Sequence, residues 1–271
     1  MDPKPSLILV TNPDNGYPEE DIFLAQRLAP AFEVKRATPR ETIALAPAAD
    51  LCLVRNAWPS REFEDEFRAL RNISGESGVP FYNPFHRTFY LERKTYLTDL
   101  EKAALPVIPT VLSLQDIGQL PEVNEYIVKP LNGCGSWNVR RIARKDLTTA
   151  DVEGCVLQPY LALDHEISLT FIDNHFVYAR RSRERRWDMV PWEADKAAIA
   201  WAQQFVDWNN MPYGLQRIDA GRLADGRMLL MEIEDIMPYL GLQEIAAETC
   251  DMVIATLTQS LRTVLHKRGQ G

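Results

Sequence analysis

The 271-residue sequence predicts an α/β fold built from successive α+β lobes. In the first third of the chain, short apolar runs such as residues 6–11 (SLILVT) alternate with segments of helical spacing, and this alternation favours a parallel sheet covered by helices. In the last third, Asp-Gly at residues 225–226 separates two runs of alternating apolar and polar residues, which is the signal of a β-hairpin. We therefore expect both parallel strands and hairpins in one chain.

The first lobe is expected to span residues 1–86. Continuous apolar runs are typical of buried parallel strands, whereas apolar residues three and four positions apart indicate helices. The strands of this lobe are predicted at 6–11, 32–37 and 50–55, and its helices at 19–31 and 62–72. Pro84 begins a loop that leads out of the lobe.

Two further lobes are expected, at residues 87–160 and 161–271. In the central lobe, a helix is predicted at 91–105 and strands at 107–111, 125–129 and 156–161. In the C-terminal lobe, strands are predicted at 167–173 and 175–181 around the turn Asp173-Asn174, then a helix at 195–208, the hairpin that turns at 225–226 and a closing helix at 242–266. Asn and Gly favour such turns because they tolerate left-handed backbone.

The composition excludes several classes of protein. A hydrophobic content of 46% and a charged content of 25% are ordinary for a globular protein with a buried core. The net charge of −8 argues against a nucleic-acid surface, and no stretch reaches the roughly 18 apolar residues of a membrane span. The four cysteines, Cys52, Cys134, Cys155 and Cys250, show no zinc or disulfide spacing. We expect a cytoplasmic protein without nucleic-acid or membrane partners.

Carboxylates gather on one face of the predicted C-terminal hairpin. If Asp225-Gly226 forms a two-residue turn, Asp219 lies opposite Glu232 and Arg217 lies opposite Glu234, all on the same face because side chains repeat every second residue. Like charges directly opposed destabilise a strand pair, and oxygen ligands of this kind suit Mg²⁺ or Mn²⁺. The alternative is a solvated outer face whose carboxylates are screened by water.

A second candidate site follows the strand that ends in Lys129. A lysine within an apolar strand needs a counter-charge, and a Gly133-x-Gly135-Ser136 loop comes directly after it. Glycines let backbone amides approach an anion closely. The loop is neither a Walker motif nor a dinucleotide fingerprint. The alternative is an ordinary hairpin turn with a lysine that reaches out to solvent.

The order of these motifs resembles the ATP-grasp superfamily, and in particular its glutathione-synthetase-like branch. The ending Glu232-Ile-Glu-Asp-Ile-Met-Pro-Tyr-Leu240 looks most like the ligases of antibiotic and small-peptide biosynthesis, such as cycloserine-forming ligases. The resemblance extends over residues 6–242. The motifs that carry it are, in order, Lys94, Pro109-Thr110, Lys129-Pro130, the glycine loop, Gln158-Pro-Tyr-Leu161, Glu166-Ile-Ser168, Arg217-x-Asp219 and Glu232-x-Glu234. It implies an ATP-grasp fold in which the two later lobes sandwich a nucleotide.

The resemblance also implies a role for each matching residue. The ATP phosphates would be bound by Lys94, Lys129, Gly133, Gly135 and Ser136, the adenine by Gln158, Tyr160 and Leu161, and the ribose by Glu166. One or two Mg²⁺ ions, with Mn²⁺ as the alternative metal, would be held by Asp219, Glu232 and Glu234. At the last position the family most often has Asn, so Glu234 adds a negative charge and leaves the number of metal ions open.

Two remaining groups of residues are candidates for substrate contacts. In the basic segment 180–186, Arg181 and Arg186 are predicted to reach a phosphate or a substrate carboxylate; the alternative is an exposed hairpin tip. Arg55, Asn56 and Trp58 follow a parallel strand at the end where ligands bind in open α/β sheets; the alternative is a capped loop with one packed indole.

The sequence thus predicts an ATP-dependent carboxylate–amine ligase. In such an enzyme a substrate carboxylate takes the γ-phosphoryl group, and an amine then displaces phosphate to form an amide. Lys129, Arg217 and Arg181 are the expected catalytic residues because they would neutralise the charge that develops on the transferred phosphoryl group. Small carboxylates and amines are the expected partners, with a homodimer as the default assembly. The alternatives are a nucleotide-binding protein of this fold without ligase activity and a small-molecule kinase.

Overall fold

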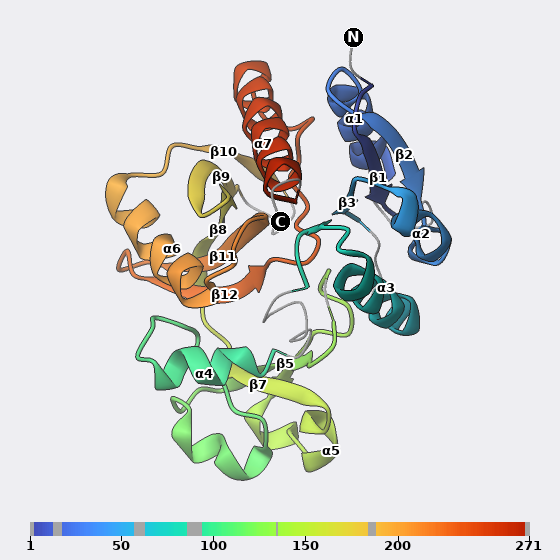
Figure 1. The fold of residues 1–271 in the computed structure, drawn as a ribbon. Coiled ribbons are helices and arrows are strands. Elements are labelled where there is room, and N and C mark those ends of the chain that lie inside the picture. Colours follow the sequence, from blue (N-terminus) through green and yellow to red (C-terminus); the bar gives the residue numbers. More distant parts are fainter. Residues whose placement is uncertain are drawn as a thin grey trace.

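The computed structural model describes residues 3–12, 18–56, 63–85, 94–133, 135–183 and 188–268. These residues form a four-stranded, a three-stranded and a five-stranded sheet. Figure 1 shows the four-stranded sheet in blue, the three-stranded sheet in green and the five-stranded sheet in yellow to orange, each with its own helices. The prediction of an α/β fold with both parallel strands and hairpins is confirmed.

The N-terminal sheet is parallel throughout, with the strand order β2-β1-β3-β4. Its strands are β1 (Ser6–Val10), β2 (Glu33–Ala37), β3 (Leu51–Val54) and β4 (Phe81–Tyr82), and its helices are α1 (Pro18–Leu28), α2 (Pro39–Leu45) and α3 (Glu64–Ser77). Sequence analysis does not predict α2, although Thr38 and Glu41 form a capping box at its start and Pro39 occupies its first turn, both of which are helix-start signals.

The central sheet is antiparallel, with the strand order β6-β5-β7. It comprises β5 (Glu125–Pro130), β6 (Arg140–Ala143) and β7 (Cys155–Pro159), with the short helices η3 (Leu114–Gln119), η4 (Arg144–Asp146) and α5 (Thr149–Val152). The strand predicted at 107–111 is not a continuous strand. Instead, Val107 bridges to Leu230 of the five-stranded sheet and Val111 bridges to Leu157 of the central sheet, so this segment connects the two.

The five-stranded sheet is antiparallel, with the strand order β10-β9-β8-β11-β12. Its strands are β8 (Leu163–Ile172), β9 (His175–Ser182), β10 (Met189–Trp192), β11 (Leu215–Leu223) and β12 (Met228–Glu234), and two helices, α6 (Lys196–Asn209) and α7 (Ala247–Arg268), belong to this part of the chain. Helix α7 begins at Ala247, after the predicted start at 242, because residues 242–245 form turns and bends instead of helix.

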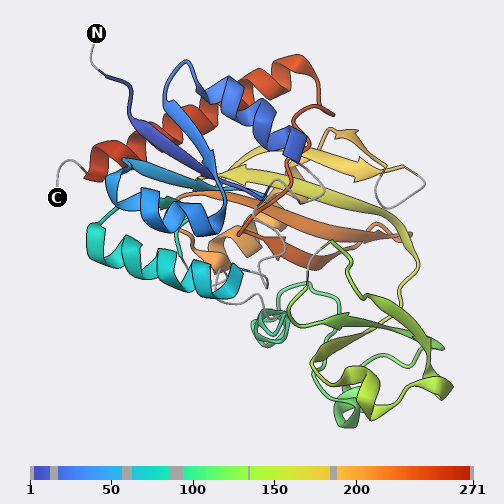
Figure 2. The same cartoon turned by 90° about the vertical axis from the view of Figure 1, so that its right-hand side faces the viewer.

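Two large apolar clusters place the five-stranded sheet between its neighbours. One cluster packs one face of this sheet against α6 and against α4 (Tyr96–Lys102), through residues such as Leu97, Leu169 and Phe205. The other cluster joins the N-terminal sheet to α7 and to the ends of the large sheet, through residues such as Leu9 and Leu257. Figure 2 shows α7 lying along the N-terminal sheet. The central sheet instead has a cluster of its own that includes Val128 and Leu157.

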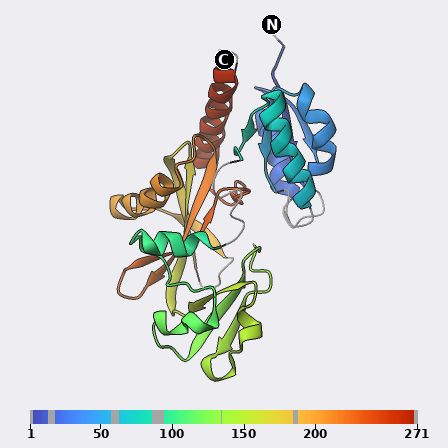
Figure 3. The same ribbon diagram turned by 60° about the horizontal axis from the view of Figure 1, so that its bottom comes forward.

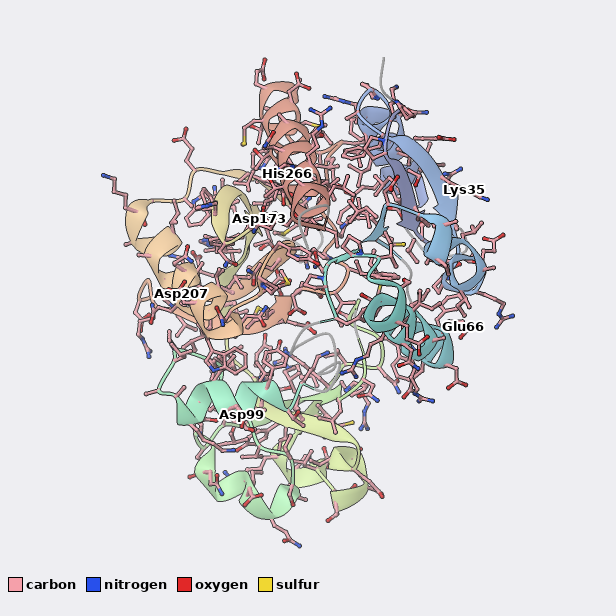
Figure 4. All side chains as sticks on the ribbon, viewed as in Figure 1. Lys35, Glu66, Asp99, Asp173, Asp207 and His266 are labelled. Atoms are coloured by element: carbon pink, nitrogen blue, oxygen red, sulfur yellow. The ribbon has the colours of Figure 1, made fainter. Side chains whose placement is uncertain are left out.

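Several predictions about what the chain lacks can be compared with the described residues. None of the helices in the described ranges has the length and apolar character needed to cross a membrane. Cys52, Cys155 and Cys250 are free thiols. His266, labelled on α7 in Figure 4, is exposed, and the other described histidines lie on different strands.

Candidate active site

The predicted charged residues of the C-terminal hairpin lie on one face of the five-stranded sheet. Asp219 of β11 lies opposite Glu232 of β12 on one side and Ser168 of β8 on the other. Arg217 lies opposite Glu234. The pairings predicted from the sequence are therefore present, and they form a polar face opposite the apolar face that packs on α6.

These pairings arise by a different route from the predicted one. The hairpin turn contains three residues, 224–226, because the Leu223 N–H donates a 2.8 Å hydrogen bond to the Arg227 carbonyl. This places the strands out of the predicted register near the turn. A bulge between Asp219 and Ala220 then shifts the register by one residue and restores the expected partners of Asp219.

Two cationic side chains neutralise the facing carboxylates. Arg217 binds Asp219 with a bidentate fork, from Nε at 2.8 Å and from Nη2 at 2.7 Å, and its Nη2 lies 3.9 Å from Glu234. Lys94 Nζ lies 2.9 Å from Glu232. The like-charge repulsion expected from the sequence is thus offset inside the protein. Within the described ranges, no group of three or more His, Cys, Asp or Glu side chains is already gathered for a metal ion.

The electrostatics of Glu234 nevertheless fit a cation. Burial, and next the charge of Glu232, raise the pKa of Glu234 to about 8, against the opposing effect of Arg217. A buried carboxyl group whose charged form is disfavoured becomes a ligand when a cation favours that charged form. Asp219, Glu232 and Glu234 offer only oxygen donors, which is the donor set that Mg²⁺ prefers.

The glycine loop and the two lysines line one pocket. This pocket is open to solvent, and its lining consists of Lys94, Lys129, Pro130, Gly133, Ser136, Trp137, Val139 and Glu232. The Ser136 hydroxyl is buried and has no hydrogen-bond partner among the described residues, and Gly135 and Ser136 both have left-handed backbone, with φ of 59° and 60°. Lys94 Nζ donates a short hydrogen bond to the Gly133 carbonyl. A hydroxyl without a partner and two cations in one pocket fit an anionic ligand.

Lys129 and Gln158 project from the face of the central sheet that lies opposite its core. Lys129 pairs with Val156, and Gln158 pairs with Ile127, whereas the neighbouring positions fill the cluster of this sheet. The Gln158 side chain is 1% exposed and donates a 2.8 Å hydrogen bond to the Thr110 hydroxyl. Both residues therefore lie on the same face of the central sheet.

The next candidate contacts are at the end of β7. The Tyr160 N–H donates a 3.0 Å hydrogen bond to the Glu125 carbonyl, and the Arg141 guanidinium lies 3.5 Å from the centre of the Tyr160 ring. The N–H of Tyr160 is thus already used within the protein. Leu161 is half-buried beside it, and Glu166 lies opposite Gly221, on the same face of the large sheet as Asp219.

The structure changes the arginine assigned to the site. Arg181 lies opposite Ile167, on the apolar side of the sheet, and is exposed. Arg180 lies opposite Ser168, in the same cross-strand row as Asp219, and is only 3% exposed. Because adjacent strand residues point to opposite faces, only Arg180 joins the candidate site. The alternation of side chains between the two faces of β9 could have identified Arg180. Two consecutive arginines, however, make the two faces look alike in the sequence.

The candidate substrate residues near β3 are internal. Arg55 is fully buried, and its Nη2 lies 2.7 Å from Glu20. Asn56 is 4% exposed and donates a 2.8 Å hydrogen bond to Asp21. Their polar groups therefore bond within the protein, which corrects the expectation that they face a substrate. Trp58 and Arg186 lie outside the described residues.

The sequence and the structure were compared with those of known proteins. No model of a protein family matches the chain. The cycloserine biosynthesis protein DcsG of Streptomyces lavendulae is 28% identical over 231 residues, which cover 69% of this chain and 76% of that protein. The crystal structure of the D-cycloserine synthetase DcsG superposes with a TM-score of 0.79 at 22% identity, covering 94% of this chain and 99% of that one.

A second solved structure extends the comparison. The ATP-grasp ligase PsnB, in complex with a phosphomimetic variant of its minimal precursor, Mg and ADP, has a TM-score of 0.68 at 16% identity, covering 96% of this chain and 100% of that one. At these identities the likeness establishes the fold. The chain has the ATP-grasp fold, and the resemblance to ATP-grasp ligases that its motifs indicate is confirmed.

Proposed function

We propose that the protein is an ATP-dependent carboxylate–amine ligase of natural-product biosynthesis, acting on a small amino-acid-like or peptide substrate. The observation that carries this proposal is the pocket in which Lys94 and the glycine loop meet Glu232 of β12, which lies opposite Asp219 of β11. The similarity to a cycloserine biosynthesis protein and to a ligase solved with Mg and ADP supports it.

The metal and the nucleotide have separate sets of residues in this proposal. Asp219, Glu232 and Glu234 would hold Mg²⁺, and Mn²⁺ would replace it because it favours the same oxygen ligands. When bound, ATP would supply the phosphoryl group that activates the substrate carboxylate, and Mg²⁺ would neutralise the charge on the phosphates. Lys94 and Lys129 would bind the phosphates, and the unpartnered Ser136 hydroxyl would donate to one of them. Lys94 would exchange its contact with Glu232 for phosphate oxygens as the metal takes the carboxylate.

The rest of the nucleotide would lie along β7 and β8. Gln158, together with the backbone of Tyr160 and Leu161, would contact the adenine, and Glu166 would bind the ribose. Because the Tyr160 N–H is already bonded to Glu125, we assign the adenine contact of this residue to its carbonyl. We also propose lobe boundaries near residues 86 and 160, which no strand of the three sheets crosses.

Two arginines would act on the substrate side of the phosphates. Arg217 lies in the centre of the polar face, with its guanidinium held by Asp219 and by the Tyr239 carbonyl at 2.7 Å. In this position it would neutralise the oxyanion that forms as the amine attacks. Arg180 would take the role first expected of Arg181, because it is the arginine of that pair on the polar face.

Release of ADP from pairs of acids and amines tests this proposal. We expect amine-dependent ADP release and an amide product for at least one pair of amino acids or small carboxylates. A stable phosphorylated product without amine would instead indicate a kinase. Nucleotide binding without turnover across the screen would indicate a binding protein without ligase activity. A cytoplasmic homodimer is part of the proposal, and light scattering tests the dimer.

A further inference from the structure

A short loop between β12 and α7 contacts both arginines of the polar face. This loop comprises residues 238–242 and is called the 238–242 loop. Its Tyr239 carbonyl accepts a 2.7 Å hydrogen bond from Arg217 Nη1. The Arg180 guanidinium lies 5.5 Å from the centre of the Tyr239 ring. It also passes so close to Gly241 that a Cβ there would overlap it. The position of this loop therefore sets the position of two cations in the site.

The other side of the 238–242 loop is held by two residues of the N-terminal lobe. The Glu20 carboxylate accepts hydrogen bonds from the backbone N–H groups of Leu240 and Leu242, each at 3.1 Å. Arg55 Nη1 donates a 2.8 Å hydrogen bond to the carbonyl of Pro238. Glu20 belongs to α1 and Arg55 follows β3, so both contacts join parts of the chain that are distant in sequence.

Glu20 and Arg55 are also paired with each other in the protein interior. Arg55 Nη2 lies 2.7 Å from Glu20 Oε1, and their side chains are 0% and 3% exposed. A buried ion pair adds little net stability because both charges lose their hydration. It does impose geometry, because each charge must keep its partners in place to avoid a large penalty. Three of those partners are backbone groups of the 238–242 loop.

We infer that Glu20 and Arg55 are positioning residues for the reaction. By fixing Pro238, Leu240 and Leu242, they fix the Tyr239 carbonyl that orients Arg217. This inference rests on the proposed ligase function, but neither residue touches the reacting atoms in it. A shift of the loop would move Arg217 relative to the phosphoryl group, and misplacement on the order of 1 Å lowers the rate of an oriented reaction by about 100-fold.

The first test is the variant Glu20→Gln. Glutamine keeps the volume of the side chain, but its NH₂ group cannot accept a hydrogen bond from a loop N–H. We expect kcat for amine-dependent ADP release to fall by about 10- to 100-fold, while KM for ATP stays within about twofold, because the lysines that bind the phosphates lie in another part of the chain. The matched control is Glu19→Gln, at the exposed neighbouring position, which should behave as wild type.

A double-mutant cycle separates positioning from a structural role. If Glu20 acts through Arg217, Glu20→Gln should have little further effect on kcat once Arg217 is replaced by Lys. Additive effects, or an unchanged kcat in Glu20→Gln, would overturn the inference. If Glu20→Gln does not fold, Arg55→Lys serves instead, because an ammonium lacks the planar fork that reaches Glu20 and Pro238 together.

Hydrogen exchange provides a readout that needs no substrate. The N–H groups of Leu240 and Leu242 should exchange faster in Glu20→Gln, while those of α7 beyond its first turn stay protected. Unchanged exchange in the 238–242 loop would also overturn the inference. If wild-type protein releases no ADP with any pair, the proposed function fails by itself, and the exchange measurement still decides whether Glu20 holds the loop.

Discussion

The five-stranded sheet meets its two neighbours through junctions of different character. Toward the N-terminal sheet, the described polar contacts are buried: Glu20 and Arg55 bond to the 238–242 loop, and Asn83 both donates to and accepts from the backbone of Leu215. A single apolar cluster also continues across this junction. Toward the central sheet, the described contacts include one backbone bridge from the connecting segment and the Lys94–Glu232 ion pair, in which Glu232 remains 26% exposed.

From this difference we infer that the N-terminal and five-stranded sheets form a fixed frame, whereas the central sheet can adjust its position. Because the central sheet has its own apolar cluster, it can shift without opening a core, whereas movement of the N-terminal sheet would expose buried charges and shared apolar surface. Figure 3 shows the central sheet below the other two, connected through the α4 region. The pocket lined by Lys94, Lys129 and Glu232 lies at the adjustable junction, and the loop that contacts Arg217 lies at the fixed one.

The largest expected effect comes from breaking the fixed junction. Arg55→Met leaves Glu20 buried without its cation, which should lower the free energy of unfolding by about 3–5 kcal/mol. Urea unfolding measures this loss. Arg27→Met is the control, because it breaks an exposed ion pair between α1 and α7 and should change stability by less than about 1 kcal/mol. Equal stabilities for the two variants would contradict the importance of the buried ion pair to this junction.

A second large effect is expected at the adjustable junction, on activity alone. Glu232→Gln removes an oxygen ligand of the proposed metal and should lower turnover by at least about 100-fold. Stability without metal should change little, because the variant loses the Lys94 contact but also relieves repulsion toward Glu234. ADP release and thermal melting, with and without Mg-ATP, measure both. Asp225→Asn, at the exposed turn of the same hairpin, should be neutral, and a fully active Glu232→Gln would exclude the metal assignment.

Nucleotide affinity provides a smaller effect. Lys129→Ala should weaken ATP binding by about 10- to 100-fold, the loss of one charge-assisted contact, while the fold is retained because alanine fits the strand. Isothermal titration measures the affinity, and Lys145→Ala on the exposed part of η4 is the control. Unchanged affinity in Lys129→Ala would place the phosphates elsewhere.

The smallest effect is a pH dependence within the fixed frame. Burial, opposed by Arg55, raises the pKa of Asp21 to about 6 from 3.8. Between these values the folded protein holds more protons than the unfolded chain, so this contribution to stability is complete below pH 3.8 and is lost as the pH rises to about 6. Through this group, the free energy of unfolding should fall by no more than about 1.4 kcal/mol per pH unit. Unfolding of Asp21→Asn across this range should lack this fall, and parallel curves would contradict it.

Local patterns in the sequence predict much of the fold but little of this contrast. The pairing of Asp219 with Glu232 follows from alternation and spacing, although the predicted turn was one residue too short and a bulge compensates. Glu20 lies more than 200 residues from Leu240 and Leu242, the residues of the 238–242 loop that bond to its carboxylate. Only the packed structure reveals such contacts, because neither partner carries a local signal. The position of Arg55 at the end of a parallel strand predicts a ligand site. In the structure, Arg55 instead forms an internal ion pair with Glu20.

Hydrogen exchange with and without Mg-ATP tests whether nucleotide binds at the adjustable junction while the frame around the 238–242 loop stays fixed. We predict that residues 132–138 gain protection when Mg-ATP is added, as a lid over a bound ligand does, and that Leu240 and Leu242 are protected equally in both states. Protection that changes at the 238–242 loop and not in the glycine loop would contradict the account.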